Sequence, residues 1–251
     1  MSTNAALPWD RNSSTDQTGI QFAEANQLLL HKIENNLFVL SQMQWRGGGY
    51  VEAPSKILDN LLWRHYLVYW TAKFATQSIS SSRPNLVEAG VCDGLTVNFA
   101  ISAVESNLGT DAQFEVFLYD AWDEMKNEFL TEKEKFATGD YAYLSIEQTK
   151  INLSEFQNRC SFIKGYIPGI FSENPGPDEI SWLHIDLNSS MPTLKTLEHF
   201  LPKLLPGGIV LFDDYGWKKF EETKEVADTF CSKFNGSLLP FPTGQAIFFK
   251  R

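Results

Sequence analysis

The sequence predicts an α/β fold: a Rossmann-like, mainly parallel sheet of seven strands with helices on both faces, preceded by a helical extension. Three observations support this prediction. From Asn85 onward, short apolar runs alternate with segments of helical periodicity, which is the pattern of βα units. A turn containing Gly90 and Gly94 joins the first predicted strand to the helix after it. Acidic residues then follow several predicted strands directly, where an open α/β sheet binds its ligands.

The first 80 residues are predicted to lie outside the sheet domain. Residues 1–20 are polar and lack the basic start and apolar core of a secretory signal, so we expect a flexible arm. Residues 21–43 have apolar positions at helical spacing, and 55–77 form a second helical segment with a broad apolar face. The glycine triplet within 46–50 predicts a hinge between them. Residues 21–80 therefore form a helical extension that either packs on the domain 81–251 or covers its site as a lid.

The elements of the sheet domain follow in regular alternation. The predicted strands are 86–91, 114–119, 160–164, 182–187, 209–212, 238–239 and 246–249. The helices predicted between them are 96–105, 145–157, 192–204 and 218–233. We expect the acceptor specificity to depend on the loops around 46–50 and 124–140.

Composition excludes several classes of partner. The formal charge of −10 disfavours nucleic acid, which binds basic surfaces, although an acidic excess is equally compatible with simple solubility. The chain has no apolar run of roughly the 20 residues that a membrane-spanning helix needs. Its three cysteines are widely spaced and lie in apolar stretches, which is typical of buried thiols in a reducing cytoplasm. We therefore expect a cytoplasmic protein that acts on a small molecule.

The turn after the first strand predicts a site for a cationic nucleotide-like cofactor. It reads Glu88-Ala89-Gly90-Val91-Cys92-Asp93-Gly94, with a GxxxG spacing in place of the GxGxxG of dinucleotide-binding folds. Gly90 and Gly94 would let the backbone approach a ligand closely. Carboxylates at Glu88 and Asp93 would repel a diphosphate but suit the ammonium and sulfonium groups of S-adenosylmethionine. A purely structural turn is the alternative, and a nicotinamide-dependent oxidoreductase is disfavoured by the spacing.

Asp120 ends the next predicted strand. A carboxylate at this strand tip can accept hydrogen bonds from both ribose hydroxyls of a nucleotide cofactor. Its structural alternative is to cap the helix predicted to start near Asp123. Trp122, two residues on, is either a contact for the adenine ring or a core residue.

Three further aspartates are expected to converge. Asp186 follows one strand, and the pair Asp213 and Asp214 follows the strand predicted to be its neighbour. Three carboxylates at short range, without a nearby positive charge, raise one another's pKa. A single divalent cation would balance their negative charge. Oxygen ligands suit Mg²⁺, Ca²⁺ or Mn²⁺ rather than zinc. The alternative is that the pair forms a turn and Asp186 faces solvent. His184, within the strand, is interpreted as a hydrogen-bonded core residue.

From about Ser55 to the C-terminus, the chain resembles the macrocin O-methyltransferase (TylF-type) family of class I S-adenosylmethionine-dependent methyltransferases. The resemblance rests on the blocks LVEAGVCDG, VFLYDAW, FIKGYI, WLHIDLNSSMPTLKTLEHFLPKLLPGGIVLFDDYG and AIFFKR. It implies the class I methyltransferase fold, transfer of a methyl group to a sugar hydroxyl, dependence on Mg²⁺, and a homo-oligomer. It also places Glu88, Gly90, Gly94 and Asp120 at cofactor positions, and Asp186, Asp213 and Asp214 at metal-ligand positions.

Asn188 departs from the family pattern. The family typically has Asp-x-Asp here, with the second aspartate proposed as general base, whereas this chain reads Asp186-Leu187-Asn188. An amide cannot take a proton from a hydroxyl at neutral pH. Either the metal alone activates the hydroxyl, another group is the base, or the substrate differs. A cofactor-binding homologue without catalytic activity is the alternative function.

Overall fold

The computed structural model describes residues 16–41, 54–79 and 83–251 and confirms the predicted fold class. Seven strands form one sheet in the order β3-β2-β1-β4-β5-β7-β6. The strands are β1 (Asn85–Ala89), β2 (Glu115–Asp120), β3 (Cys160–Lys164), β4 (Ile180–Ile185), β5 (Leu204–Phe212), β6 (Gly236–Pro240) and β7 (Ala246–Lys250). The first five are parallel, while β7 runs antiparallel to both β5 and β6.

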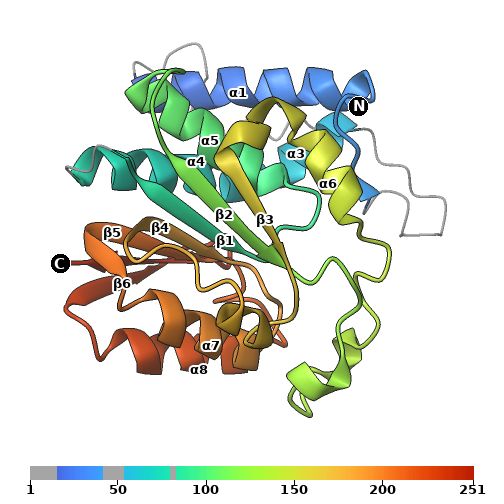
Figure 1. Cartoon of the computed structure of the whole chain (residues 1–251), viewed down its shortest axis with the longest axis vertical. Coiled ribbons are helices and arrows are strands. Elements are labelled where there is room, and N and C mark those ends of the chain that lie inside the picture. Colours follow the sequence, from blue (N-terminus) through green and yellow to red (C-terminus); the bar gives the residue numbers. More distant parts are fainter. Residues whose placement is uncertain (1–15, 42–53, 80–82) are drawn as a thin grey trace.

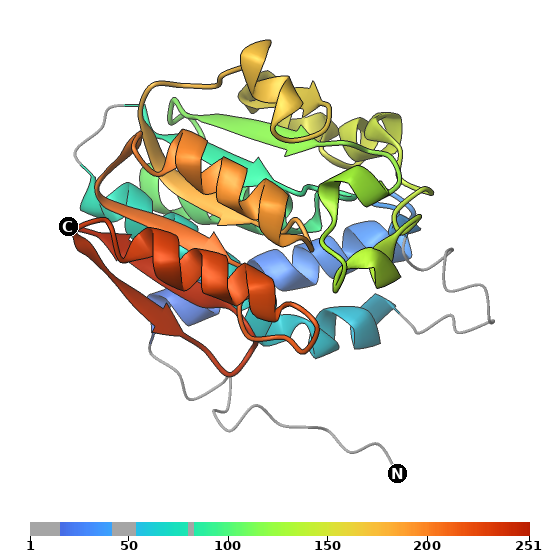
Figure 2. The same ribbon diagram turned by 90° about the horizontal axis from the view of Figure 1, so that it is seen from below.

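Helices cover both faces of the sheet (Figure 1). The helices on one face are α1 (Gln17–Glu34), α3 (Pro54–Asn60), α4 (Leu62–Ser78), α5 (Leu95–Leu108) and α6 (Ile146–Asn152). The turned view of Figure 2 shows α7 (Ser190–Phe200) and α8 (Glu221–Cys231) side by side on the other face. Each face has its own apolar core, because the buried strands alternate their side chains between the two layers. The central strands β1 and β4 are buried almost throughout, as expected for a parallel sheet covered on both sides.

Several element boundaries differ from the sequence prediction. The first helix spans Gln17–Glu34, and it ends early because Asn36 adopts a positive φ of 56°. Its first turn lies in the segment 1–20 that was predicted to be a flexible arm; residues 1–15 and the predicted hinge at 46–50 lie outside the described residues. The segment predicted as one helix over 55–77 is two helices, because Leu61 leaves helical geometry between α3 and α4.

The later helices are also shorter than their periodicity predicts. The segment 145–157 divides into α6 and a 3-10 helix, Ser154–Arg159. The helix predicted over 192–204 ends at Phe200, since β5 already begins at Leu204. The helix predicted over 218–233 is α8. Among the described residues, no helix is both long enough and apolar enough to cross a bilayer.

The strand order reverses between β1 and β4, which places a crevice at the carboxyl ends of the central strands. The connection from β2 to α6 extends beyond these strand ends (Figure 1). It contains two short 3-10 helices, η1 (Asn127–Phe129) and η2 (Lys135–Ala137). The fold therefore brings the ends of β1, β2, β4 and β5 together with one long loop.

Candidate functional site

A cavity of about 470 Å³ opens at the carboxyl ends of the central strands. Its lining comes from the tips of β1, β2, β4 and β5, from the β2–α6 loop, and from the junction of α3 and α4. The polar residues that concern its chemistry are Arg64, Asp120, Asp186, Asn188, Asp213 and Asp214. The predicted site residues thus fall largely on one cavity, although several of them turn away from it.

Gly90 lies at the cavity where β1 meets β4. Its φ is +89°, and a Cβ built on it would lie 1.8 Å from the carbonyl oxygen of Asp186. No side chain fits this close approach between two strand ends. Gly94 also has a positive φ, +84°, but an added Cβ there would meet Leu153 rather than the cavity. Gly90 therefore shapes the cavity, while Gly94 lets α5 begin.

Asp120 ties the end of β2 to the glycine turn. One carboxylate oxygen accepts hydrogen bonds from the N–H groups of Val91 (2.6 Å) and Cys92 (2.8 Å), and the other accepts one from Trp122 (2.7 Å). Burial raises the pKa of this carboxyl group, and the three amide donors oppose that effect. Asp120 therefore holds the turn in shape, and it also lines the cavity.

Three residues predicted to bind the cofactor have other partners. Glu88 points to the α4 and α5 face of the sheet, because side chains alternate along β1, and it contacts His184 and Thr96. Asp93 accepts hydrogen bonds from the backbone and the hydroxyl of Ser41. Neither of these two residues, nor the third, Trp122, is among the residues that line the cavity.

Trp122 is the third of these residues. It is only 2 % exposed, and its indole N–H lies 2.9 Å from the hydroxyl of Thr149 and 3.1 Å from the carbonyl oxygen of Cys92. The ring is therefore a core residue that supports the glycine turn from behind, which was the structural alternative for this position.

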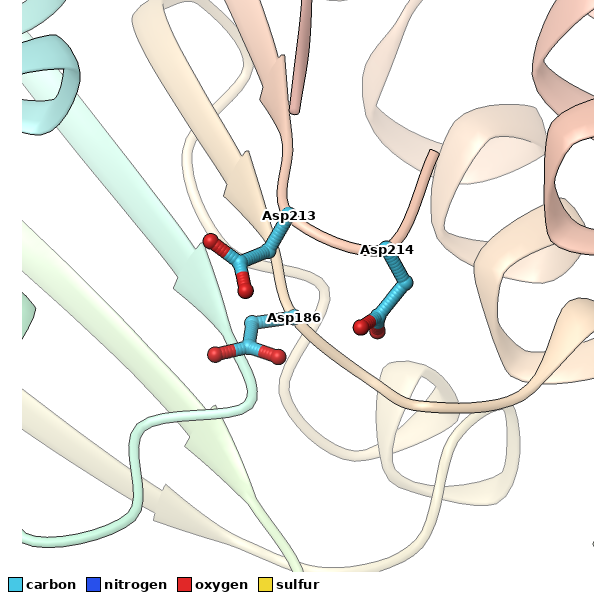
Figure 3. Close-up of side chains that lie close together, drawn as sticks. All are labelled: Asp186, Asp213 and Asp214. Carbon is cyan, nitrogen blue, oxygen red and sulfur yellow. The ribbon is translucent and has the colours of Figure 1, made fainter. Parts of the chain in front are cut away.

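The three aspartates converge as predicted. Asp186 follows β4, and Asp213 and Asp214 follow β5, whose last residues pair with those of β4. One carboxylate oxygen from each lies within 4.8 Å of the others. Figure 3 shows the carboxylates of Asp186 and Asp213 facing each other. The side chain of Asp214, which follows Asp213 in the chain, points to the same side. We call these three residues the acidic cluster.

An arginine that the sequence analysis did not select already contacts the acidic cluster. In the first turn of α4, Arg64 places Nε 2.8 and 2.9 Å from the two carboxylate oxygens of Asp213. Its Nη2 lies 2.5 Å from Oδ2 of Asp186. The helical segment predicted over 55–77 also contains Lys56 and Lys73, so no local pattern in the sequence distinguished Arg64.

The charges of the acidic cluster are strongly coupled. Burial, reinforced by Asp213, raises the pKa of Asp186 to about 6 against the opposing effect of Arg64. Burial and the two neighbouring carboxylates also raise the pKa of Asp214. Burial acts in the same direction on Asp213, but Arg64 and His184 outweigh it and hold its pKa well below the usual range. Asp213 is thus firmly ionised, whereas Asp186 and Asp214 gain a proton more readily.

Asn188 lies at the edge of the acidic cluster. Its φ of 51° is left-handed, a conformation that asparagine tolerates well. Its side-chain amide lies 3.3 Å from Oδ1 of Asp186, and its backbone N–H donates to Asp214 (2.9 Å). Asn188 therefore contacts two acids of the cluster, Asp186 through its side chain and Asp214 through its backbone.

The β2–α6 loop is fastened beside the cavity by Glu134, another residue that sequence reasoning missed. This carboxylate is 1 % exposed and accepts hydrogen bonds from the backbone N–H of Ser190 (2.7 Å) and the hydroxyl of Ser189 (3.0 Å) at the start of α7. A carboxylate at a helix N-terminus is favoured by the orientation of the peptide dipoles. Glu134 thus fixes the loop against the domain.

A family of methyltransferase domains matches residues 87–215, slightly more than half of the chain. The match begins in β1 and ends one residue beyond the acidic cluster. The chain belongs to this methyltransferase family. A sequence search against curated proteins gave no significant match.

Solved structures similar to this methyltransferase support the same fold. The O-methyltransferase NovP superposes with a TM-score of 0.62 at 18 % identity, over 74 % of this chain and 79 % of NovP. The calicheamicin methyltransferase CalS11 has a TM-score of 0.58 at 15 % identity, over 96 % of each chain. An apo structure of CalS11, described as TDP-rhamnose 3'-O-methyltransferase, has a TM-score of 0.50 at 18 % identity, over 90 % of this chain and 93 % of that one.

Proposed function

We propose that this methyltransferase uses S-adenosylmethionine to methylate a hydroxyl group of a small molecule, with a sugar or glycosylated metabolite as the preferred class. The observation that carries the proposal is the acidic cluster, which opens into the same cavity as Gly90 and Asp120. The likeness to the O-methyltransferase NovP supports an oxygen acceptor, and the likeness to CalS11, a TDP-rhamnose 3'-O-methyltransferase, supports the sugar class. The resemblance of the sequence to TylF-type enzymes agrees with it.

The residues that would hold S-adenosylmethionine lie at the ends of β1 and β2: Gly90 would let the methyl donor approach the backbone, and Asp120 would accept hydrogen bonds from the ribose. Asn188 and the acidic cluster would orient the acceptor hydroxyl toward the methyl group that the cofactor supplies. Asp186 is the candidate base, because one of its oxygens faces only the weak amide contact of Asn188.

The acidic cluster also has the donor chemistry of a divalent-cation site. Its three oxygens are the ligand type that Mg²⁺ and Mn²⁺ prefer, although Arg64 now contacts two of the three residues. Asp186, Asp213 and Asp214 would hold the ion, and it would supply charge that favours the deprotonated acceptor hydroxyl. Metal dependence is therefore part of the proposal, and Arg64 occupies two of the carboxylates that the ion would use.

Isothermal titration with S-adenosylmethionine and S-adenosylhomocysteine tests the cofactor. We expect micromolar binding of both, with and without a chelator, because the cofactor contacts do not involve the acidic cluster. A panel of sugar and catechol acceptors, followed by mass spectrometry for a gain of one methyl group, then tests the reaction. Absence of binding by either compound would remove the cofactor assignment and the roles of Gly90 and Asp120.

A cofactor-binding protein without catalysis is the second candidate, and the amide at Asn188 favours it. The variant Asn188→Asp restores the acid at the position where related enzymes carry it. If the parent chain binds cofactor but methylates nothing in the panel, while Asn188→Asp gains activity, the chemistry has been lost. If the parent chain is active and Asn188→Asp is not faster, the catalytic proposal stands.

A further inference from the structure

The acidic cluster has a cation supplied by the chain itself. The Arg64 guanidinium places Nε 2.8 Å from Oδ1 of Asp213 and Nη2 2.7 Å from its Oδ2, and Nη2 also donates to one oxygen of Asp186. These contacts join residues 149 and 122 positions apart in the sequence. A planar guanidinium that binds a carboxylate in this bidentate way compensates negative charge well. Arg64 thus already provides the compensation for which the sequence analysis invoked a metal ion.

Helix stability gives no reason for an arginine at this position. Arg64 lies in the first turn of α4, where the peptide dipoles disfavour a positive side chain. The favourable interactions of its charge are therefore with Asp186 and Asp213. Its side chain lines the cavity and keeps 26 % of its surface exposed, so the guanidinium can withdraw into solvent without unpacking a core.

Arg64 and a divalent cation would share carboxylates of the acidic cluster. The guanidinium contacts both oxygens of Asp213 and Oδ2 of Asp186, so a metal ligand at Asp213 must be an oxygen that Arg64 already contacts. Two cations at such range also repel each other. Binding of one cation therefore opposes binding of the other.

We propose that Arg64 and a divalent cation compete for the acidic cluster, so that Arg64 sets the metal affinity of this protein. The metal-bound form is favoured when α4 has released its arginine from Asp186 and Asp213. This inference rests on the proposed function for the role of the cluster, but its test reads metal binding alone.

Other contacts hold the carboxylates in place when Arg64 withdraws. Gln245 donates from its side-chain amide to Asp213 (2.9 Å), and the backbone N–H of Asn188 donates to Asp214 (2.9 Å). A substitution of Arg64 therefore removes the competitor and leaves these two acids with hydrogen-bond partners.

Manganese binding to the full-length, chelator-treated protein tests the competition. Electron paramagnetic resonance of free Mn²⁺ is recorded for the parent chain, Arg64→Gln and Arg64→Lys. Arg83→Gln is the matched control, because Arg83 forms an exposed ion pair with Glu115 on another part of the surface. If the released state is populated at about 0.1–10 %, removing the competitor tightens the apparent Mn²⁺ affinity by roughly tenfold to a thousandfold. Arg64→Lys keeps the positive charge but lacks the planar pair of N–H donors, so its Mn²⁺ affinity should lie between those of the parent chain and Arg64→Gln.

A double variant and the possible contrary outcomes complete the Mn²⁺ titration. Adding Asp213→Asn to Arg64→Gln should abolish the gained binding, because one ligand is lost. Equal Mn²⁺ affinity in the parent chain, Arg64→Gln and Arg64→Lys overturns the proposal, whether that affinity is high or undetectable. If Arg64→Gln does not fold, as judged by circular dichroism, the comparison of Arg64→Lys with the parent chain decides. Titration of each variant with S-adenosylhomocysteine separately tests the methyltransferase proposal.

Discussion

His184 Nδ1 lies 2.8 Å from Oε1 of Glu88, and both side chains are fully buried between neighbouring strands. The other ring nitrogen of His184 lies 3.8 Å from Oδ1 of Asp213. Burial disfavours a charged imidazole, but the two carboxylates outweigh it and raise the pKa of His184 to about 10. The acidic cluster thus has a second cation behind it, on the α4 and α5 face of the sheet.

Replacing Glu88 with Gln should destabilise the protein by about 3–5 kcal/mol at neutral pH, the usual cost of breaking a buried ion pair. Because the pKa of His184 is raised from 6.5 to about 10, its contribution is complete below pH 6.5 and is lost as the pH rises to 10. The free energy of unfolding of the parent chain should therefore fall over that interval, and that of Glu88→Gln should fall less. Urea denaturation at pH 7 and pH 9.5 measures both effects.

Glu105→Gln is the control for that prediction. Glu105 pairs with Arg159, and about a fifth of each side chain is exposed, so the loss should be about 1 kcal/mol or less. Equal losses in the two variants would show that the Glu88–His184 pair has no special role in stability.

Gly90→Ala should prevent folding or leave a protein that no longer binds S-adenosylhomocysteine. The added Cβ would lie 1.8 Å from the carbonyl oxygen of Asp186, in a backbone that already has a φ of +89°. Gly109→Ala separates the steric clash from the backbone strain, because Gly109 has a φ of +90° but nothing within 4 Å of the added Cβ. We expect Gly109→Ala to cost about 1–3 kcal/mol, because its φ of 90° and ψ of 158° lie in a region that few residues other than glycine adopt. Thermal unfolding compares them, and similar melting temperatures would contradict the steric argument.

Asp120→Asn should weaken both the turn and the cofactor site. The amide offers one acceptor oxygen, whereas the carboxylate accepts from three backbone N–H groups, so we expect a loss of about 1–3 kcal/mol in stability. A lost ribose contact should weaken S-adenosylhomocysteine binding on the order of tenfold, or about 1.4 kcal/mol. The exposed Asp111→Asn is the control. Unchanged affinity in calorimetry would remove the ribose role.

Alkylation should distinguish the three cysteines. Burial raises the pKa of Cys160 and of Cys231 to about 12, so few thiolates form there at pH 8. Cys92 lines the cavity beside Asp120 and should react first with iodoacetamide. Saturating S-adenosylhomocysteine should then slow the reaction at Cys92. Peptide mass spectrometry measures each site, and an unprotected Cys92 would place the cofactor elsewhere.

The sheet and the acidic cluster follow from local patterns in the sequence. Buried parallel strands are short apolar runs, and residues that directly follow neighbouring strands must meet at one edge of the sheet. For this reason the positions of Gly90 and Asp120, and the convergence of Asp186 with Asp213 and Asp214, agree with the sequence analysis.

Only the tertiary structure decides what each of these side chains contacts. Glu88 turns to the α4 and α5 face and meets His184, a relation fixed by the register of two strands nearly a hundred residues apart in sequence. Arg64 reaches Asp213 because α4 packs on β4 and β5. Periodicity shows which residues share a face of one element, but not which distant element covers that face. The counter-charge of the acidic cluster was therefore hidden in the sequence, and long-range packing determines it.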